Sequence, residues 1–254
     1  MGEALVAGLL GAEWAVPTEL LVVETVESRR RELAARFEGL QVADVPTGAE
    51  GAVIAVKPGD VEAACRAVAA AQVPRVLSIA AGVPLARLEA WVGQGVPVVR
   101  AMPNTPALVG KGAAAIAAGQ AAGEGDLGWA EGILSAVGTV VRVPEHLLDA
   151  VTGLSGSGPA YVFLVAEALI EAGVHAGLPR DTSAALVVQT LVGSAHLLAE
   201  SGQGPETLRA AVTSPGGTTA AALRALEERA VRGAFLAAVQ AATERSQALG
   251  RPPG

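Results

Sequence analysis

The chain has few of the residue types on which several common chemistries depend. Only 3% of its 254 residues are aromatic, one is cysteine (Cys65) and three are histidine. A single cysteine excludes an intramolecular disulfide and a cysteine metal cluster, and it fits a reducing cytoplasm. The histidines, at positions 146, 175 and 196, are too scattered for a metal site. We therefore predict a cytoplasmic protein without a bound metal.

Positive charge is also scarce. The net charge is −7, and the only basic block is Arg29-Arg30-Arg31. Nucleic acids attract proteins mainly through basic surfaces, so we expect no nucleic-acid partner. An anionic substrate gains nothing from the field of the whole protein and has to be captured by local groups.

No segment is expected to enter a membrane. The apolar stretch 4–10 follows Glu3 and has no lysine or arginine before it, which is wrong for a signal peptide. The longer apolar stretch 160–178 contains Glu167 and Glu171. We expect it to be too short and too interrupted to span a bilayer.

In the first part of the chain, apolar runs alternate with helix-like segments. The runs predict strands at 20–23, 52–56, 75–79, 96–101, 112–118 and 139–143. The intervening segments predict helices at 2–11, 28–37, 61–71, 84–91 and 124–136. Alternation of this kind predicts an α/β domain with a parallel sheet.

The pattern changes near Glu145, after which no strand is predicted. Helices are expected at 159–173, 180–201, 205–212 and 219–250, and residues 251–254 are expected to be a frayed end. The first two helices are apolar on most faces, which predicts burial against other helices or another subunit. We therefore predict two domains, an α/β domain at 1–146 and an all-helical domain at 147–254.

A glycine-rich turn precedes the last predicted helix. Pro215, Gly216 and Gly217 cannot continue a helix, whereas the residues after them are rich in alanine and leucine. The N-terminus of a helix presents free N–H donors and partial positive charge, which favour an anion. We predict that this turn binds a small carboxylate substrate, with hydroxyl groups from Ser214, Thr218 and Thr219. The alternative is ordinary capping of the helix by Thr218 or Thr219.

The front of the chain carries part of a dinucleotide-binding pattern. Such folds open with a strand, a glycine-rich turn and a helix, and an acidic residue about 20 positions later binds the ribose. The helix begins at Gly2 and the acid is Glu24, at the end of an apolar strand. The first strand and most of the glycine turn are not present before Met1.

Six motifs together resemble those of pyrroline-5-carboxylate reductases, in the family's order and spacing over nearly the whole chain. They are Met1-Gly-Glu-Ala-Leu, Ala55-Val-Lys-Pro58, Ala80-Ala-Gly82, Arg100-Ala-Met-Pro-Asn-Thr-Pro-Ala107, Gly153-Leu-Ser-Gly-Ser-Gly-Pro-Ala-Tyr161 and Thr213-Ser-Pro-Gly-Gly-Thr-Thr219. The resemblance implies NAD(P)H-dependent reduction of 1-pyrroline-5-carboxylate to L-proline. It also implies an N-terminal Rossmann-like domain and a helical domain that forms a homodimer, and beyond that a ring of dimers.

The main departure from the family is at the front, where only Met-Gly remains of its Gly-x-Gly-x-Met-Gly turn. The first strand of a doubly wound sheet is central, so its loss would expose apolar edges of its neighbours. We expect the true start to lie upstream of Met1. A chain that really began here would bind its cofactor poorly and would have low solubility.

The resemblance also implies which residues form the site. The cofactor residues are Gly2, Glu24, Ala55, Val56, Lys57, Pro58, Ala80, Ala81 and Gly82, while the substrate residues are Gly216, Gly217, Thr218, Thr219, Met102 and Asn104. Thr219 and Ser214 are the candidate catalytic residues. Taken without the family, Lys57 is a solvated lysine and Asn104 a loop residue that serves the backbone. The turn Ser155-Gly-Ser-Gly-Pro159 is either a wall of the active site or a helix start.

The choice between NADPH and NADH is open. Glu24 would repel the 2′-phosphate of NADPH, whereas Arg29 and Arg30 would bind it. The family resemblance favours NADPH, with NADH as the alternative.

Two other functions compete with this one. A 3-hydroxy-acid dehydrogenase would need a lysine on a helix of the second domain, but residues 147–254 contain no lysine. The second alternative is an inactive dimerisation protein that has lost its cofactor strand.

Overall fold

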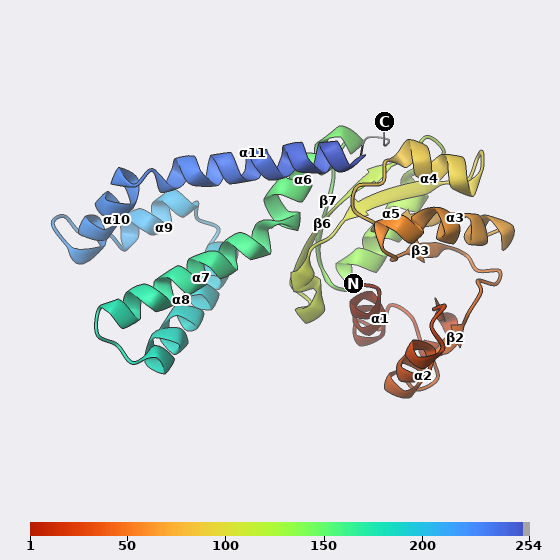
Figure 1. Cartoon of the computed structure of the whole chain (residues 1–254), viewed down its shortest axis with the longest axis horizontal. Coiled ribbons are helices and arrows are strands. Elements are labelled where there is room, and N and C mark those ends of the chain that lie inside the picture. Colours follow the sequence, from red (N-terminus) through yellow and green to blue (C-terminus); the bar gives the residue numbers. More distant parts are fainter. Residues whose placement is uncertain (251–254) are drawn as a thin grey trace. The chain divides into compact units, whose positions relative to one another are not determined.

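The computed structural model describes residues 1–250, so the tail predicted at 251–254 lies outside the described part. The chain forms two compact units (Figure 1). The first contains Met1–Ser157 together with residues 241–250, and the second is Gly158–Gln240.

Seven strands form two sheets in the first unit. In one, β1 (Leu21–Val23) pairs in parallel with β2 (Gln41–Ala43). The other has the order β3-β4-β5-β6-β7, with bounds Ala52–Ile54, Val76–Ser78, Val98–Met102, Gly112–Ala118 and Gly138–Arg142. Six of the strands lie at predicted positions; β2 was not predicted.

The five-stranded sheet is mixed, which corrects the prediction of a parallel sheet. β3, β4 and β5 are parallel and β6 is parallel to β7, but β6 runs antiparallel to β5, with Arg100 opposite Ala117. Only residues 103–111 connect β5 to β6, and they contain the short 3-10 helix η3 (Thr105–Val109). Parallel strands need a crossover of about a dozen residues or more, so this connection is too short.

The helices of the first unit begin and end within a few residues of their predicted positions. They are α1 (Gly2–Gly11), α2 (Glu27–Arg36), α3 (Val61–Ala70), α4 (Leu85–Val92) and α5 (Glu124–Ser135). The short α6 (Leu148–Val151) was not predicted. Three further short 3-10 helices are η1 (Pro17–Glu19), η2 (Pro58–Asp60) and η4 (Glu145–Leu147). A π-helical turn, η5 (Thr152–Gly156), follows α6 directly.

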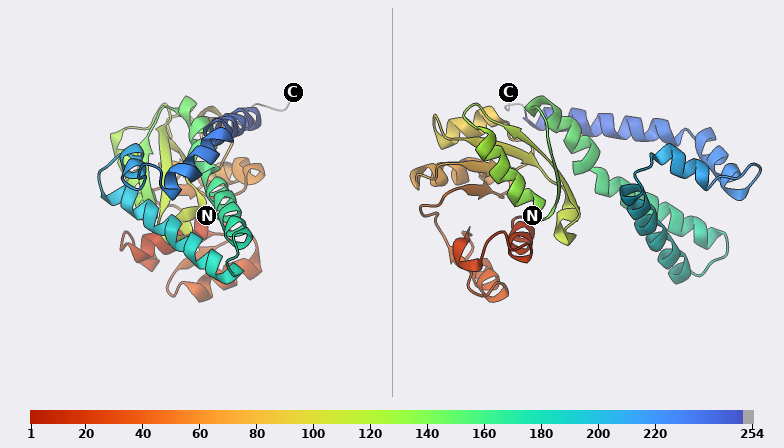
Figure 2. Two further views of the ribbon diagram at one scale, coloured as in Figure 1. Left: turned by 90° about the vertical axis from the view of Figure 1, so that its left-hand side faces the viewer. Right: turned by 180° about the vertical axis from the view of Figure 1, so that it is seen from behind.

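The core lies on both faces of the five-stranded sheet, which helices cover on each side (Figure 2). Val76 and Val98 pack with Cys65 and Leu88 from α3 and α4. Their chain neighbours Leu77 and Val99 point to the other face, among residues of α1 and α5. Successive residues of a strand face opposite sides, so strands buried on both faces are apolar throughout.

The two sheets do not join. Among the described residues β1 pairs only with β2, and β3 pairs only with β4. Each therefore has one edge without a neighbouring strand, and Val23 of β1 is 41% exposed.

The second unit is entirely helical. It contains α7 (Gly158–His175), α8 (Arg180–Glu200), α9 (Pro205–Ala211), α10 (Thr218–Glu228) and the first half of α11 (Val231–Gly250). The single helix predicted at 219–250 is wrong, because Ala230 has φ +52° and breaks the segment into α10 and α11. A residue in the left-handed region ends a helix.

The α7–α8 pair leaves much of its apolar surface uncovered within one chain. Phe163, Leu164 and Leu186 are more than half exposed. The two helices approach closely at Gly173, where any Cβ would collide with the buried Ser183. His175 and His196 are exposed, so they are not packed inside this chain.

The helical stretches Glu145–His175 and Arg180–Glu200 are long and apolar enough to cross a membrane. The expectation that 160–178 is too short is therefore wrong, because the helix continues on its N-terminal side. Length and composition alone do not distinguish a membrane span from a helix that another protein surface covers.

The compact units differ from the predicted division at 146/147. Leu148 of α6 is buried in the core of the first unit, and Ser246 Oγ of α11 donates a 2.6 Å hydrogen bond to Asp149 Oδ1. These contacts extend the first unit to Ser157 and add the end of α11 to it.

Candidate functional site

The predicted substrate turn precedes α10 as expected. Gly216 has φ +70°, a conformation that favours glycine, and the Gly217 N–H donates to the Ser214 carbonyl at 3.1 Å. A Cβ on Gly217 would collide with Ser214 Oγ unless the serine side chain rotated away. The two glycines therefore allow a tight turn against the serine side chain.

The structure does not support the capping alternative for this turn. Gly217 is the N-cap residue, and no side chain caps the helix. Thr218 and Thr219 are instead the first two residues of α10. Among the described residues, no acceptor is found for the N–H groups of Thr218, Thr219 and Ala220. The start of α10 thus offers free donors that suit a carboxylate.

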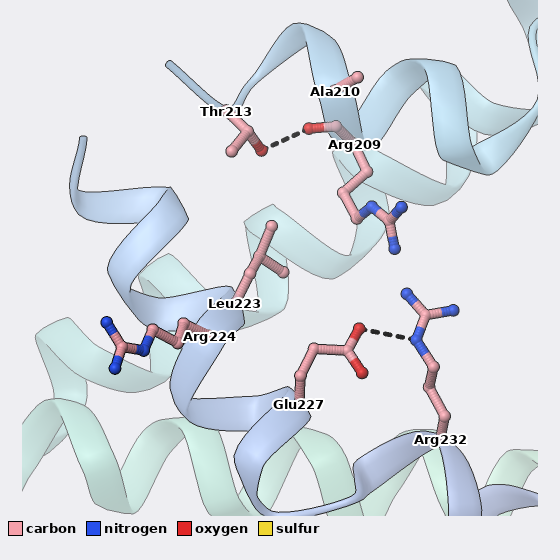
Figure 3. Close-up of a pocket in the computed structure, with 7 residues that line it drawn as sticks. All are labelled: Arg209, Ala210, Thr213, Leu223, Arg224, Glu227 and Arg232. Carbon is pink, nitrogen blue, oxygen red and sulfur yellow. Dashed lines mark hydrogen bonds and ion pairs between the residues drawn. The ribbon is translucent and has the colours of Figure 1, made fainter. Parts of the chain in front are cut away.

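A cavity of about 420 Å³ lies between α9, α10 and the start of α11 (Figure 3). It is lined by Arg209, Ala210, Thr213, Leu223, Arg224, Glu227 and Arg232. Arg232 Nε bonds Glu227 Oε1 at 2.7 Å, and Arg224 Nε bonds Glu228 Oε1 at 2.9 Å. Two of the three guanidinium groups are thus neutralised, and the glycines of the turn are not part of the lining.

The predicted cofactor residues lie at the ends of strands in the first unit. Ala55–Pro58 follow β3 and are exposed, while Ala80–Gly82 follow β4. Gly2 is the first residue of α1, and a Cβ there would lie 3.2 Å from Ala55 Cβ. The structure thus brings the start of α1 against the end of β3.

This arrangement fits part of a dinucleotide site. Among the described residues, the N–H groups of Gly2, Glu3 and Ala4 have no acceptor. Free N–H groups at a helix start favour a pyrophosphate, and ligands of open α/β sheets bind at the carboxyl ends of the strands. Because Gly2 has no side chain, the space between the start of α1 and the end of β3 stays unfilled.

Glu24 and the arginines of α2 form one charged cluster. Glu24 Oε1 accepts from the Val26 N–H at 2.9 Å, and Arg30 Nη1 donates to the carbonyls of Glu24 and Thr25 at 2.8 and 2.9 Å. Arg29 is ion-paired with Glu32 and Glu3, and its hydrogen bond to Glu32 and the charge of Glu3 raise its pKa further. Arg29 is therefore engaged by carboxylates, whereas Arg30 lies directly beside Glu24.

Asn104 is buried, and backbone groups occupy both ends of its side-chain amide. Nδ2 donates to the Ser155 carbonyl at 3.0 Å, and Oδ1 accepts from the Ala113 N–H at 2.9 Å. Its predicted contact with substrate stays a prediction. Ser155 Oγ donates to the Val151 carbonyl at 3.1 Å, so it makes a bond within its own helical segment.

Arg100 and Glu145 form a partly buried ion pair that the sequence did not predict. Arg100 Nη1 lies 2.9 Å from Glu145 Oε1, which also accepts from the Leu85 N–H at 2.6 Å. The Arg100 side chain is only 10% exposed. This pair ties β5 to η4 and to the start of α4, just before Met102. An arginine inside an otherwise apolar strand was the available signal.

Comparison with known proteins links both units to one family. A model described as pyrroline-5-carboxylate reductase dimerisation matches residues 145–249. The pyrroline-5-carboxylate reductase of Corynebacterium melassecola is 44% identical over 261 residues, covering 99% of this chain and 96% of the relative. That of Mycobacterium tuberculosis H37Rv is 45% identical over 276 residues, covering 98% and 93%.

Solved structures show the same likeness over the full length. A pyrroline-5-carboxylate reductase from Coxiella burnetii is 34% identical with a TM-score of 0.93, covering 99% of this chain and 95% of the other. A Plasmodium falciparum pyrroline carboxylate reductase with NADP bound is 31% identical with a TM-score of 0.86, with the same coverage.

Proposed function

The chain belongs to the pyrroline-5-carboxylate reductase family, and on that basis we propose that it reduces 1-pyrroline-5-carboxylate to L-proline with NADPH, or with NADH. This is the last step of proline biosynthesis. The observation that carries the proposal is the 44–45% identity to curated reductases over nearly the whole chain.

Hydride transfer to an imine requires the protein to align substrate and cofactor more than to supply acid–base groups. NAD(P)H, when bound, supplies the hydride that reduces the C=N bond. The substrate nitrogen can arrive protonated, so the protein has to orient the ring and exclude water. We assign the carboxylate of the substrate to the turn at Gly216, Gly217 and Thr218. The Gly217 N–H already donates to the Ser214 carbonyl, so the donors left for the carboxylate are the free N–H groups at the start of α10, from Thr218 to Ala220. The Thr219 hydroxyl then contacts the ring nitrogen or carboxylate and can relay a proton, with Ser214 beside it.

The cofactor is assigned to Gly2, Glu24, Ala55–Pro58 and Ala80–Gly82, and Met102 and Asn104 are assigned to the border of the nicotinamide. Free N–H groups at the start of α1 and the exposed residues after β3 support this assignment. Lys57 is exposed, and its ammonium group has no partner among the described residues, so it is available to a phosphate.

The proposed form of the protein is a cytoplasmic homodimer. The family resemblance further implies a ring built from such dimers. The dimerisation match covers both long apolar helices, α7 and α8. A second copy of the chain would cover their exposed side chains, so a membrane is not needed to explain them.

The direct test is oxidation of NADPH and of NADH in the presence of pyrroline-5-carboxylate. The assay should use the chain as printed and a version extended upstream of Met1. We expect turnover with at least the extended form, and the better cofactor should be NADPH. No turnover by either form would refute the reductase proposal and favour the inactive dimerisation protein.

Thr219→Ala tests the substrate turn. Loss of one hydrogen bond to a charged group costs about 1.5–3 kcal/mol, so we expect kcat/KM for pyrroline-5-carboxylate to fall about tenfold or more. The Kd for NADPH, measured by fluorescence titration, should not change. Thr207→Ala on the exposed surface of α9 is the matched control. Unchanged kinetics in Thr219→Ala would show that the hydroxyl is dispensable.

A further inference from the structure

Asn104 joins two turns that are far apart in the sequence. It is the only asparagine in the chain, and it is 9% exposed. Its amide bonds the Ser155 carbonyl in η5 on one side and the Ala113 N–H at the start of β6 on the other. The Asn104 side chain therefore fixes the loop after β5 through hydrogen bonds at both its oxygen and its nitrogen.

The Ser155 carbonyl is available for a chemical reason. In an α-helix the carbonyl of residue i accepts from the N–H of residue i+4, which here is Pro159 and has no N–H. The segment instead makes a π-type turn, with the Ser157 N–H donating to the Thr152 carbonyl at 2.8 Å. A partly buried carbonyl without a partner destabilises the fold, and Asn104 Nδ2 supplies that partner.

Met102 makes a second contact between the same two turns. A Cβ on Gly156 would lie 2.6 Å from Met102 Cε, so the methionine side chain lies directly on the glycine. Met102 and Pro103 are thus confined between Gly156 and the hydrogen bonds of Asn104. Turns of the π type often occur at functional sites.

We infer that Asn104 is a positioning residue, which holds Met102 and Pro103 in place for the nicotinamide by clamping the loop after β5 to the Thr152–Gly156 turn. The inference rests on the proposed function, because Met102 borders the nicotinamide only if the chain binds that cofactor. Asn104 acts through two backbone groups and needs no contact of its own with the substrate.

Asn104→Asp tests this role with almost no change in size. The aspartate keeps an oxygen for the Ala113 N–H, but it places a second oxygen against the Ser155 carbonyl. We expect kcat with NADPH to fall about tenfold, which corresponds to about 1.4 kcal/mol, and KM for NADPH to rise, because the partly buried Ser155 carbonyl loses its donor. KM for pyrroline-5-carboxylate should stay nearly constant. Gln120→Glu, the same chemical change on an exposed loop, is the control.

A second substitution distinguishes loss of the hydrogen bond between Asn104 and the Ser155 carbonyl from general damage to the fold. Pro159→Ala restores an N–H that can bond the Ser155 carbonyl within the helix. In the Pro159→Ala background, Asn104→Asp should therefore cost much less kcat than it does in the wild-type background. An equal loss in both backgrounds would overturn the inference, as would wild-type kcat and KM values in Asn104→Asp.

Hydrogen exchange tests the clamp without any activity. In Asn104→Ala the Ala113 amide loses its acceptor, so its exchange should become at least about tenfold faster. Amides of α5 should keep their wild-type rates. Unchanged exchange at Ala113 would overturn the inference whatever the activity. The exchange of Ala113 could be faster in Asn104→Ala while the wild-type chain never reduces pyrroline-5-carboxylate. That result would support the role of Asn104 in holding the loop and would reject the proposed function.

Discussion

Glu24 and Arg30 place opposite charges at the end of β1, where a ribose is expected. The Glu24 carboxylate is bonded to the Val26 N–H, and the Arg30 guanidinium is bonded to the Glu24 carbonyl. Arg29 is held by Glu3 and Glu32. We therefore expect cofactor preference to depend on the balance between Glu24 and Arg30 more than on Arg29.

Glu24→Gln should increase the preference for NADPH. Two unit charges about 4 Å apart in water interact with about 1 kcal/mol, and a 2′-phosphate carries close to two charges. We expect the ratio of kcat/KM for NADPH to that for NADH to rise about tenfold. Glu27→Gln, which removes a carboxylate paired with Arg31 in the same helix, should leave the ratio unchanged. The same ratio in both variants would contradict a role for Glu24.

Cys65 should make the stability of the protein depend on pH in the alkaline range. Burial raises the pKa of the thiol from 9.0 to about 11. The unfolded state therefore loses this proton first as the pH rises, so the contribution of the thiol is fully present below about pH 9 and is lost by about pH 11. The loss amounts to about 2–3 kcal/mol.

Urea unfolding between pH 7 and pH 10.5 measures this effect. Other groups also titrate in this range, so the comparison is with Cys65→Ala, which lacks the thiol. The free energy of unfolding should decline more steeply above pH 9 in the wild type than in the variant. Parallel curves would mean that the thiol is accessible to water in the folded state.

At the scale of elements, the break between α10 and α11 depends on one alanine. Ala230 has φ +52°, and the left-handed region costs an alanine about 1–2 kcal/mol. No glycine or proline marks this position, so the sequence predicted one continuous helix from 219 to 250.

Ala230→Gly should stabilise the protein by about 1 kcal/mol, since glycine adopts the left-handed conformation without a steric cost. The matched control is Ala225→Gly inside α10, which should destabilise by about 1 kcal/mol. Thermal and urea unfolding of both variants give the comparison. Equal destabilisation by the two glycines would mean that the helix is continuous at Ala230.

At the scale of the whole molecule, the helical unit exposes more apolar surface than a single chain can leave in water. Leu164 is 65% exposed and Leu186 is 56% exposed, and the dimerisation match covers both. Large exposed apolar patches mark interfaces. We therefore expect the mass in solution to be at least twice the 25.3 kDa of one chain.

Leu164→Glu should weaken this association, because it places a charge in an apolar interface. Light scattering coupled to size exclusion should show a lower mass or aggregation. Leu108→Glu puts the same charge at a residue that is 68% exposed in the first unit and should leave the mass unchanged. A wild-type mass of one chain would contradict the proposed dimer.

Local patterns in the sequence determined most elements and the turn before α10. The bounds of α1 and β6 agree with the predicted ones, because a glycine or a change of hydrophobic pattern marks each end. A turn is likewise specified locally by Pro215, Gly216 and Gly217, which do not continue a helix. Backbone preferences of single residues act over a few neighbours, so the sequence alone carries them.

Only the tertiary structure decided which distant groups meet. It set the antiparallel direction of β6, the separation of β1 and β2 from the larger sheet, and the left-handed conformation of Ala230. It also gave Asn104 its partners at Ala113 and Ser155 and paired Arg100 with Glu145. The energies of these hydrogen bonds and ion pairs depend on groups 9 to 51 positions apart that only the folded chain brings within hydrogen-bond distance, and no local pattern records them.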